Sequence, residues 1–403
     1  MARTQPDTRR GAGRSGASAG TVLRTVLDRG PVARSTIARV TGVSPATVTT
    51  ASAQLVERGL LRELPEISGP TGLGRPHVPV DLDDSRFVVY GIHLAMTHVT
   101  TALLDLRGQV LARSRDPHLG LGPAEILRNA VTTLEALAAR HGDVSVPIGV
   151  GFAAGGWIDS ESGVVPEHPI PGWNGYPVRA DLEHRTGLDV RMDSHARALI
   201  DAEVLFGEPR ARDSVVQLFV GNVVDAAFAT GGVVHHGPRA AAGAVAHVPV
   251  ENSVEECTCG RTGCVQATLS DRVLVRRAMQ LGIIERPIFG DLLDAGRRRQ
   301  PAALALFEER AHSVGVVAAR LLDLFNPEVL IVCDQGVSRI PGSLDTVRRA
   351  VGESSATCDD PSRSVLSTSF PRRALPLSAG SVILAELYRA PLTSFVRPLA
   401  GIS

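Results

Sequence analysis

Apolar side chains recur at helical spacing in short segments near the N-terminus. After a polar stretch rich in Arg, Gly, Ser and Ala over residues 1–19, the pattern predicts one helix over residues 21–29 and another over residues 34–40. A third helix is predicted to begin at Ser44-Pro45, because Ser is a favoured N-cap and Pro suits the first helical position. Residues 1–19 have almost no apolar positions, so we expect them to form a disordered basic arm.

Two short strand patterns follow the third helix. They cover residues 60–64 and 77–82 and are separated by a turn-rich tip at residues 68–75. Three helices followed by such a hairpin predict a winged helix-turn-helix over residues 20–82.

Beyond residue 85 the chain alternates strand patterns with helical ones. Apolar strands are predicted at residues 87–92, 148–152 and 329–332, and amphipathic helices at 122–141 and 307–325. This order predicts an α/β body with two lobes, each built on a mixed sheet. The expected boundaries are residues 86–198 for the first lobe, completed by a C-terminal helix within about 377–403, and 199–376 for the second lobe.

Composition and charge narrow the function. With 403 residues, 44% hydrophobic and 21% charged, the chain has the size and balance of a soluble protein of two or three domains. It has neither an apolar run of membrane-spanning length nor a signal peptide, so we expect a cytoplasmic protein without a membrane partner. The net charge of zero hides an asymmetry, because residues 1–80 hold eleven Arg and five acidic residues, a net +6. A basic head on an acidic body predicts that the head binds a polyanion such as double-stranded DNA.

The predicted third helix and hairpin supply the candidate DNA contacts. The N-terminal part of that helix would enter a major groove, where threonine hydroxyls and methyls can contact base edges or phosphates. Arg75, within Gly74-Arg75-Pro76 at the hairpin tip, would enter a minor groove. The alternative for each residue is a solvated polar helix face or an ordinary turn. The candidates are Arg34, Arg39, Ser44, Thr47, Thr49, Thr50 and Arg75.

A cysteine cluster carries the strongest chemical signal in the chain. Cys257, Cys259 and Cys264 lie in a turn with two glycines, and His247 stands ten positions upstream of the first. Thiolate and imidazole are preferred zinc ligands, and three Cys with one His complete a closed tetrahedron. A buried apolar turn or a disulfide is the alternative, although Cys257 and Cys259 are too close in sequence for a relaxed disulfide. The spacing therefore predicts a structural Zn²⁺ site.

Several of these motifs together resemble the ROK family, which joins repressors and sugar kinases, and more narrowly its repressor branch with an N-terminal winged helix-turn-helix. The family's most specific mark is the Cys-x-Cys-Gly-x-x-Gly-Cys run with its upstream His. The resemblance implies an actin- and hexokinase-like fold with a ligand cleft between two lobes. The other shared motifs are Gly74-Arg75-Pro76, Pro171-Gly172-Trp173, Glu203-Val204-Leu205-Phe206-Gly207 and Asn326-Pro327-Glu328.

The departures from the kinase pattern of that family are as informative. The early phosphate loop has His93 in place of an acidic residue, and the family's Asn-Asp pair, whose Asp is the base, corresponds to Ser194-His195. The second phosphate loop, residues 221–225, keeps one glycine. The carboxylates that hold a sugar are replaced by Ala244 and Gln266. By the same resemblance, the candidate ligand-binding residues are Ser194, His195, His247 and Gln266.

The sequence thus predicts a DNA-binding transcriptional regulator, a repressor of carbohydrate-linked genes, and not an enzyme. Its body would be a degenerate kinase scaffold that either binds a sugar-like effector in the cleft or only dimerises, and the binding unit would be a homodimer or homotetramer. Two alternatives stay open. One is an active ATP-dependent sugar kinase with a fused DNA-binding head, and the other is a regulator controlled by a protein partner.

Overall fold

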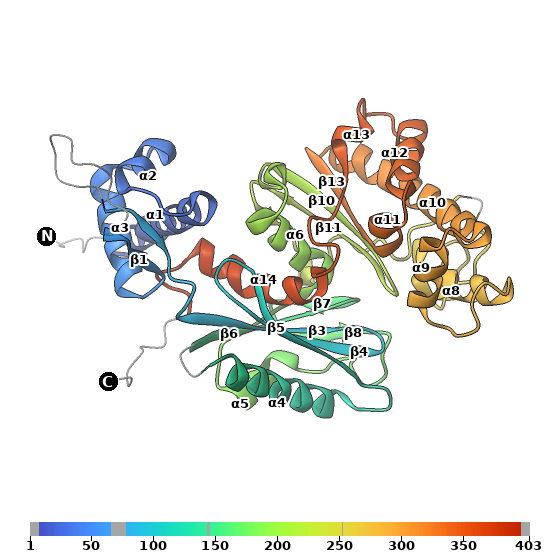
Figure 1. Cartoon of the computed structure of the whole chain (residues 1–403), viewed down its shortest axis with the longest axis horizontal. Helices are drawn as coiled ribbons and strands as arrows, with labels where there is room; N and C mark the ends of the chain where they lie inside the picture. The colour runs from blue at the N-terminus through green and yellow to red at the C-terminus, as the bar shows by residue number, and fades with distance from the viewer. Residues whose placement is uncertain (1–7, 66–77, 143–145, 252, 396–403) are drawn as a thin grey trace, which may run out of the picture.

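The computed structural model describes residues 8–65, 78–142, 146–251 and 253–395, arranged as a small head and two larger lobes (Figure 1). The head contains three helices and a two-stranded antiparallel sheet in which Leu61 pairs with Leu82. Ser44 caps the third helix by accepting a hydrogen bond from the Thr47 N–H, as its sequence predicts. The head elements are α1 (Thr8–Arg29), α2 (Arg34–Thr41), α3 (Pro45–Glu57), β1 (Leu61–Glu63) and β2 (Val80–Leu82).

The first helix is longer than its sequence predicts. We expected a disordered arm up to residue 19, but α1 already begins at Thr8. The C-terminal end of the expected arm packs against α14 (Ala374–Arg389): Ala19 is fully buried, and a Cβ on Gly20 would lie 2.7 Å from the Tyr388 carbonyl oxygen. Tertiary contact thus overrides the weak helical propensity of a Gly-rich segment.

The first lobe has a five-stranded mixed sheet in the order β5-β4-β3-β6-β9. Its central strand β3 is buried on both faces, so Val88 packs toward α4 whereas Val89 packs toward α14. Gly151 allows close approach, because a Cβ there would overlap the Ala379 carbonyl of α14. The lobe contains β3 (Phe87–Leu94), β4 (His98–Leu104), β5 (Val110–Pro117), α4 (Pro123–His141), β6 (Val146–Ala154), β7 (Trp157–Asp159), β8 (Val164–Glu167), α5 (Val178–Thr186) and β9 (Val190–Ser194).

The second lobe has its own five-stranded mixed sheet, in the order β12-β11-β10-β13-β14. Helices α10 and α12 pack together on it, and α6 leads into this lobe from the end of β9. The prediction of two α/β lobes with mixed sheets is confirmed. The elements are α6 (His195–Phe206), η2 (Pro209–Arg212), β10 (Ser214–Val220), β11 (Val224–Thr230), β12 (Val233–Val234), η3 (Pro238–Ala240), α7 (Val265–Leu269), α8 (Asp271–Gln280), α9 (Phe289–Arg297), α10 (Pro301–Phe325), β13 (Val329–Asp334), α11 (Gln335–Arg339), α12 (Ser343–Ser354), α13 (Pro361–Ser364) and β14 (Val365–Ser367).

The head is joined to the body by a shared apolar core. Leu23 and Val26 of α1 belong to the same buried cluster as Leu387 and Tyr388 of α14. In Figure 1 the end of α14 accordingly lies beside α1. No helix among the described residues combines the length and apolarity that crossing a membrane would require.

Candidate metal centre, cleft and nucleic-acid surface

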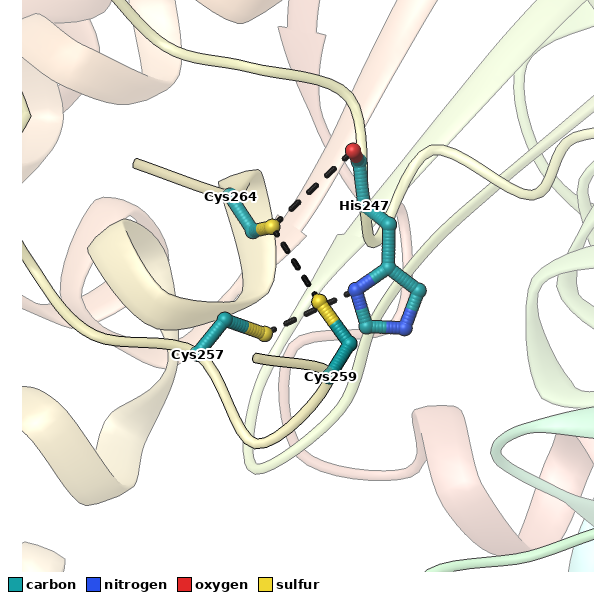
Figure 2. A group of neighbouring side chains, drawn as sticks. All are labelled: His247, Cys257, Cys259 and Cys264. Carbon is teal, nitrogen blue, oxygen red and sulfur yellow. Dashed lines mark hydrogen bonds between the residues drawn. The ribbon is translucent and has the colours of Figure 1, made fainter. Parts of the chain in front are cut away.

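The predicted metal ligands converge on one point ahead of α7. One ligand atom from each of His247, Cys257, Cys259 and Cys264 lies within 4.8 Å of all the others (Figure 2). The Nδ1 atom of His247 is 3.6 Å from the Cys257 sulfur, and the sulfurs of Cys259 and Cys264 are 3.7 Å apart. Zn–S bonds of about 2.3 Å and Zn–N bonds of about 2.0 Å in a tetrahedron place neighbouring ligand atoms about 3.5–3.8 Å apart. The side chains therefore fit a four-coordinate zinc ion.

The backbone of the cysteine loop explains this convergence. The N–H of Cys257 donates to the Arg261 carbonyl at 2.8 Å, which closes a tight turn around Gly260. Gly260 and Gly263 have φ values of 85° and 72°, in the left-handed region that favours glycine. A Cβ on Gly263 would also lie 2.8 Å from the Ser253 carbonyl oxygen. Both glycines are therefore needed for the fold of this loop.

Cys259 is the most exposed of the three thiols. Its pKa is lowered to about 6, because the backbone N–H and the guanidinium of Arg261 stabilise its thiolate. The thiolate is the form that binds zinc. All five cysteines of the chain are free, so the cluster is not a disulfide.

A cleft of about 1220 Å³ is lined by residues of both lobes. From the first lobe it takes the ends of β3 and β4, and from the second the residues 219–223 and parts of α8, α9 and α11. His93 and His195, at the two positions where the kinase pattern has acidic residues, both line it.

His93 and His195 form a parallel pair of buried rings. Their centroids are 5.9 Å apart with an interplanar angle of 5°. Burial lowers the pKa of His93 to about 3 and holds that of His195 well below its usual value, so both imidazoles are neutral. Among the described residues, neither nitrogen of His93 has a hydrogen-bond partner, nor does Nε2 of His195. These two positions thus offer unused hydrogen-bonding groups and no carboxylate.

Asp193, two positions before His195 in the chain, is already engaged. It accepts hydrogen bonds from Arg197 Nε and, at 2.8 Å, from His236 Nε2. Arg197 is itself buried and donates to the carbonyls of Ile158 and Ala240 at 3.0 and 2.9 Å. Asp193 therefore holds the start of α6 in place and is not free to deprotonate a hydroxyl group.

The four residues predicted to bind a ligand are not brought together. Only His195 lines the cleft, since the His247 ring faces the cysteines and Ser194 caps α6. Gln266 uses both ends of its amide on the loop before β11. Its Oε1 accepts from the Val224 N–H and its Nε2 donates to the Asn222 carbonyl, both at 2.7 Å. Gln266 therefore holds the cleft-lining loop in place without lining the cleft itself.

A buried ionic group beside the cleft has no local sequence signal. Arg310 of α10 bonds Asp271 at 2.8 Å and Asp334 at 2.7 Å, and all three side chains are buried. Burial raises the pKa of Asp271 to about 6, against the lowering influence of Arg310. The three residues come from separate helices and a strand end, so only the fold unites them.

The exposed face of α3 carries part of the predicted DNA surface. Thr49 and Thr50 are exposed, with the Thr49 hydroxyl donating to the Pro45 carbonyl at 2.9 Å. Thr47 is half-buried, and its hydroxyl is 2.8 Å from that of Ser44. The hydroxyls of Ser44 and Thr47 therefore share one hydrogen bond at the start of the helix.

The predicted phosphate-binding arginines differ in whether they already form an ion pair. Arg34 forms an ion pair with Glu63 of β1 at 2.6 Å, and Arg39 is exposed and forms no ion pair with any residue of the described ranges. Arg75 lies outside the described residues. Of the two arginines on α2, Arg39 is thus the one free to meet a phosphate.

Two α/β lobes around a shared cleft, with a helical head on one side, are the architecture of an actin- and hexokinase-like body fused to a smaller module. The ROK family model matches residues 89–365, and the chain belongs to the ROK family. Transcriptional regulator Rv0485 of Mycobacterium tuberculosis is 33% identical over 400 residues, covering 95% of this chain and 88% of the relative.

Two solved structures share the fold. A ROK family transcriptional regulator, a homolog of the E. coli MLC protein, matches with a TM-score of 0.78 at 21% identity and covers 95% of this chain and 99% of that one. A ROK family glucokinase from Streptomyces griseus, in complex with glucose and AMPPNP, matches with a TM-score of 0.65 at 24% identity. The match covers 98% of the glucokinase chain and 73% of this chain.

Proposed function

We propose that this protein is a DNA-binding transcriptional regulator that represses carbohydrate-linked genes. The observation that carries the proposal is the head, where a Ser44-capped helix with an exposed polar face follows two helices and precedes a small hairpin. This is the arrangement of a winged helix-turn-helix, with α3 as the recognition helix. The net charge of +6 over residues 1–80 suits a DNA partner, and the similarity to a mycobacterial transcriptional regulator over almost the whole chain supports the same function.

The body acts as a sensor and not as a kinase in this proposal. Phosphoryl transfer depends on positioned charges and a base. Here the two kinase positions are neutral imidazoles, and Asp193 is held by Arg197 and His236. We therefore expect no sugar phosphorylation, although the glucokinase shows that the fold can support it.

The metal centre has a structural role in this proposal. Four protein ligands leave no open coordination position for water or substrate. Bound Zn²⁺ would cross-link the loop that runs from His247 to Cys264, directly before α7. Because Gln266 of α7 holds the loop at Asn222, the metal would indirectly position one wall of the cleft.

The DNA-bound form should be at least a dimer. Most soluble oligomers have two-fold symmetry, and a two-fold symmetric reader selects a pseudo-palindromic operator. Half-sites would then be separated by about one helical turn, ~10 base pairs, or a multiple of it.

Genome-wide mapping of bound DNA, followed by titration of the recovered site, tests this proposal. Thr50→Glu places a negative charge on the exposed face of α3 and should abolish operator binding through repulsion by phosphate. Ala302→Glu adds the same charge at an exposed position of α10 in the second lobe and serves as the control. Equal operator affinity of the Thr50→Glu variant and the wild type would refute α3 as the recognition helix.

A further inference from the structure

The cleft is strongly basic although the body as a whole is acidic. Its lining contains six arginines and only two acidic residues, Asp271 and Asp334. Among the residues that the structure describes, Arg276 alone of these arginines has a carboxylate partner, Glu255 at 2.5 Å. The six are Arg113, Arg115, Arg272, Arg276, Arg339 and Arg372.

The two acidic residues do not balance this charge. Asp271 and Asp334 both bond Arg310, which lies behind the cleft wall and is buried. One oxygen of Asp334 also accepts from the Val337 N–H at 3.0 Å. Asp271, Asp334 and Arg310 together therefore carry a net charge of −1 at most. The six guanidinium groups of the lining carry +6.

Arg339 is one of the lining arginines that form no ion pair with a described residue. It is half-buried, and its Nε has no hydrogen-bond partner among the described residues. Its pKa is lowered mainly by burial and further by the neighbouring cations Arg297 and Arg372, against the raising influence of Asp294. A group of cations that repel one another in a partly desolvated cleft is a site prepared for an anion.

The buried histidines add unpaired ring nitrogens. His93 and His195 line the cleft, and three of their ring nitrogens are buried without a partner among the described residues. A neutral imidazole carries one N–H, so each ring can supply one donor. Buried polar groups are nearly always hydrogen-bonded, so their lack of protein partners points to a ligand. Guanidinium and imidazole N–H groups suit phosphate and carboxylate oxygens.

We propose that the cleft binds a small organic anion carrying phosphate or carboxylate groups, and that this anion is the effector of the regulator proposed above. The proposal rests on that function. A neutral sugar would leave the guanidinium charges unbalanced. A magnesium nucleotide would find no unengaged carboxylate in the described lining to hold its metal ion, since Asp271 and Asp334 are both bonded to Arg310.

Calorimetric titration of the full-length protein with matched probes tests the proposal. Glucose and glucose 6-phosphate differ only by the phosphoryl group, and citrate and tripolyphosphate separate carboxylate from phosphate chemistry. At least one of the three anions should bind tenfold or more tightly than glucose, and its affinity should fall as salt is raised. Arg339→Gln should weaken that binding at least tenfold. Arg140→Gln removes the same charge from an exposed position on α4, outside the cleft, and should leave it unchanged.

Three results would overturn the proposal: no anion binding up to millimolar concentration, tighter binding of glucose than of every anion, or equal loss in the Arg339→Gln and Arg140→Gln variants. Operator affinity is measured separately on the same proteins. If the Arg339→Gln variant and the wild type bind operator but no anion binds, the cleft proposal alone fails. If neither protein binds operator, the regulator proposal itself fails.

Discussion

Arg212 and Asp28 form a doubly hydrogen-bonded ion pair between the second lobe and the head. Nη1 and Nη2 of Arg212 lie 2.9 and 2.8 Å from the two carboxylate oxygens of Asp28 on α1. Arg24, one turn earlier on α1, donates to the Val204 carbonyl near the end of α6. The other side of α1 packs on α14, which covers the sheet of the first lobe. Helix α1 therefore contacts both lobes. If the lobes move relative to one another, either its ion pair with Arg212 or its packing on α14 has to change.

Removing this ion pair should loosen the head without unfolding the protein. The pair is partly exposed, so Arg212→Gln should lower the free energy of unfolding by less than about 1 kcal/mol. Amide hydrogen exchange in α1 should nevertheless become faster, because the local contact is lost. Arg286→Gln, which removes an exposed ion pair with Asp291 inside the second lobe, is the control and should leave α1 exchange unchanged. Unaltered exchange in both variants would show that the pair does not restrain the head.

The packing of α1 on α14 can be tested with two glycines of the same helix. A Cβ on Gly20 would lie 2.7 and 2.8 Å from the carbonyl oxygens of Tyr388 and Arg389, so Gly20→Ala should destabilise the protein by about 1–3 kcal/mol through overpacking. Gly16 has no atom within 4 Å of such a Cβ, and Gly16→Ala should be neutral or stabilising by up to about 1 kcal/mol. Denaturant unfolding measures both. Similar effects of the two substitutions would mean that α1 is not docked on α14.

Local patterns made the head and the cysteine cluster predictable. Ser44-Pro45 defines a helix start by itself, and the ligands Cys257, Cys259 and Cys264 lie within eight residues of one loop. The start of α1 was predicted wrongly, and Tyr388, against which Gly20 of this helix packs, is more than 300 positions away in the chain. The sequence therefore predicted the elements that depend on interactions between residues close together in the chain.

The cleft could be predicted only in outline. Of the residues predicted to bind a ligand, His195 lines the cleft, and His93, noted in the sequence only as a lost kinase position, lines it as well. Gln266 was assigned to the ligand, but its amide is satisfied by the backbone at Asn222 and Val224. The arginines of the lining come from segments spread from β5 to the residues before α14, and no spacing in the sequence marks them as one group.

Substitution of one cysteine should empty the metal centre. The purified protein should contain about one zinc ion per chain, and Cys259→Ser should remove it because three ligands hold zinc less tightly. If free zinc is a thousandfold above its Kd, the loss amounts to about 4 kcal/mol of stability. Elemental analysis and thermal unfolding check this, with Cys358→Ser as the control outside the cluster. If the wild-type protein were as stable without zinc as with it, the metal would have no structural role.

Acid should destabilise the protein through its buried histidines. Burial lowers the folded-state pKa of His93 to about 3 and of His168 to about 4, against 6.5. Below pH 6.5 the unfolded chain therefore binds more protons than the folded one, so stability falls as the pH is lowered. At pH 5.5 each such ring costs about 1.4 kcal/mol relative to neutral pH.

Denaturant unfolding at pH 7.5 and 5.5 measures this difference. His93→Gln should reduce the loss of stability between the two pH values by about 1.4 kcal/mol, because one of the responsible rings is gone. His141→Gln, at an exposed position of α4, should leave the difference unchanged. If His93→Gln behaved like the control, the ring of His93 would not be buried in its neutral form.

The two arginines of α2 should affect DNA binding differently. Arg39 is exposed and unpaired within the described ranges, so Arg39→Gln should weaken binding to operator and random duplex alike. It should also flatten the slope of log affinity against log salt by about one unit, the effect of losing one phosphate contact. Arg34 is held by Glu63 at 2.6 Å and also donates to the Val78 carbonyl, so Arg34→Gln should change the slope far less. Fluorescence titrations of both variants at several salt concentrations make the comparison. An equal flattening in the two variants would mean that Arg34 leaves Glu63 for a phosphate when DNA binds, and that the ion pair belongs to the free protein alone.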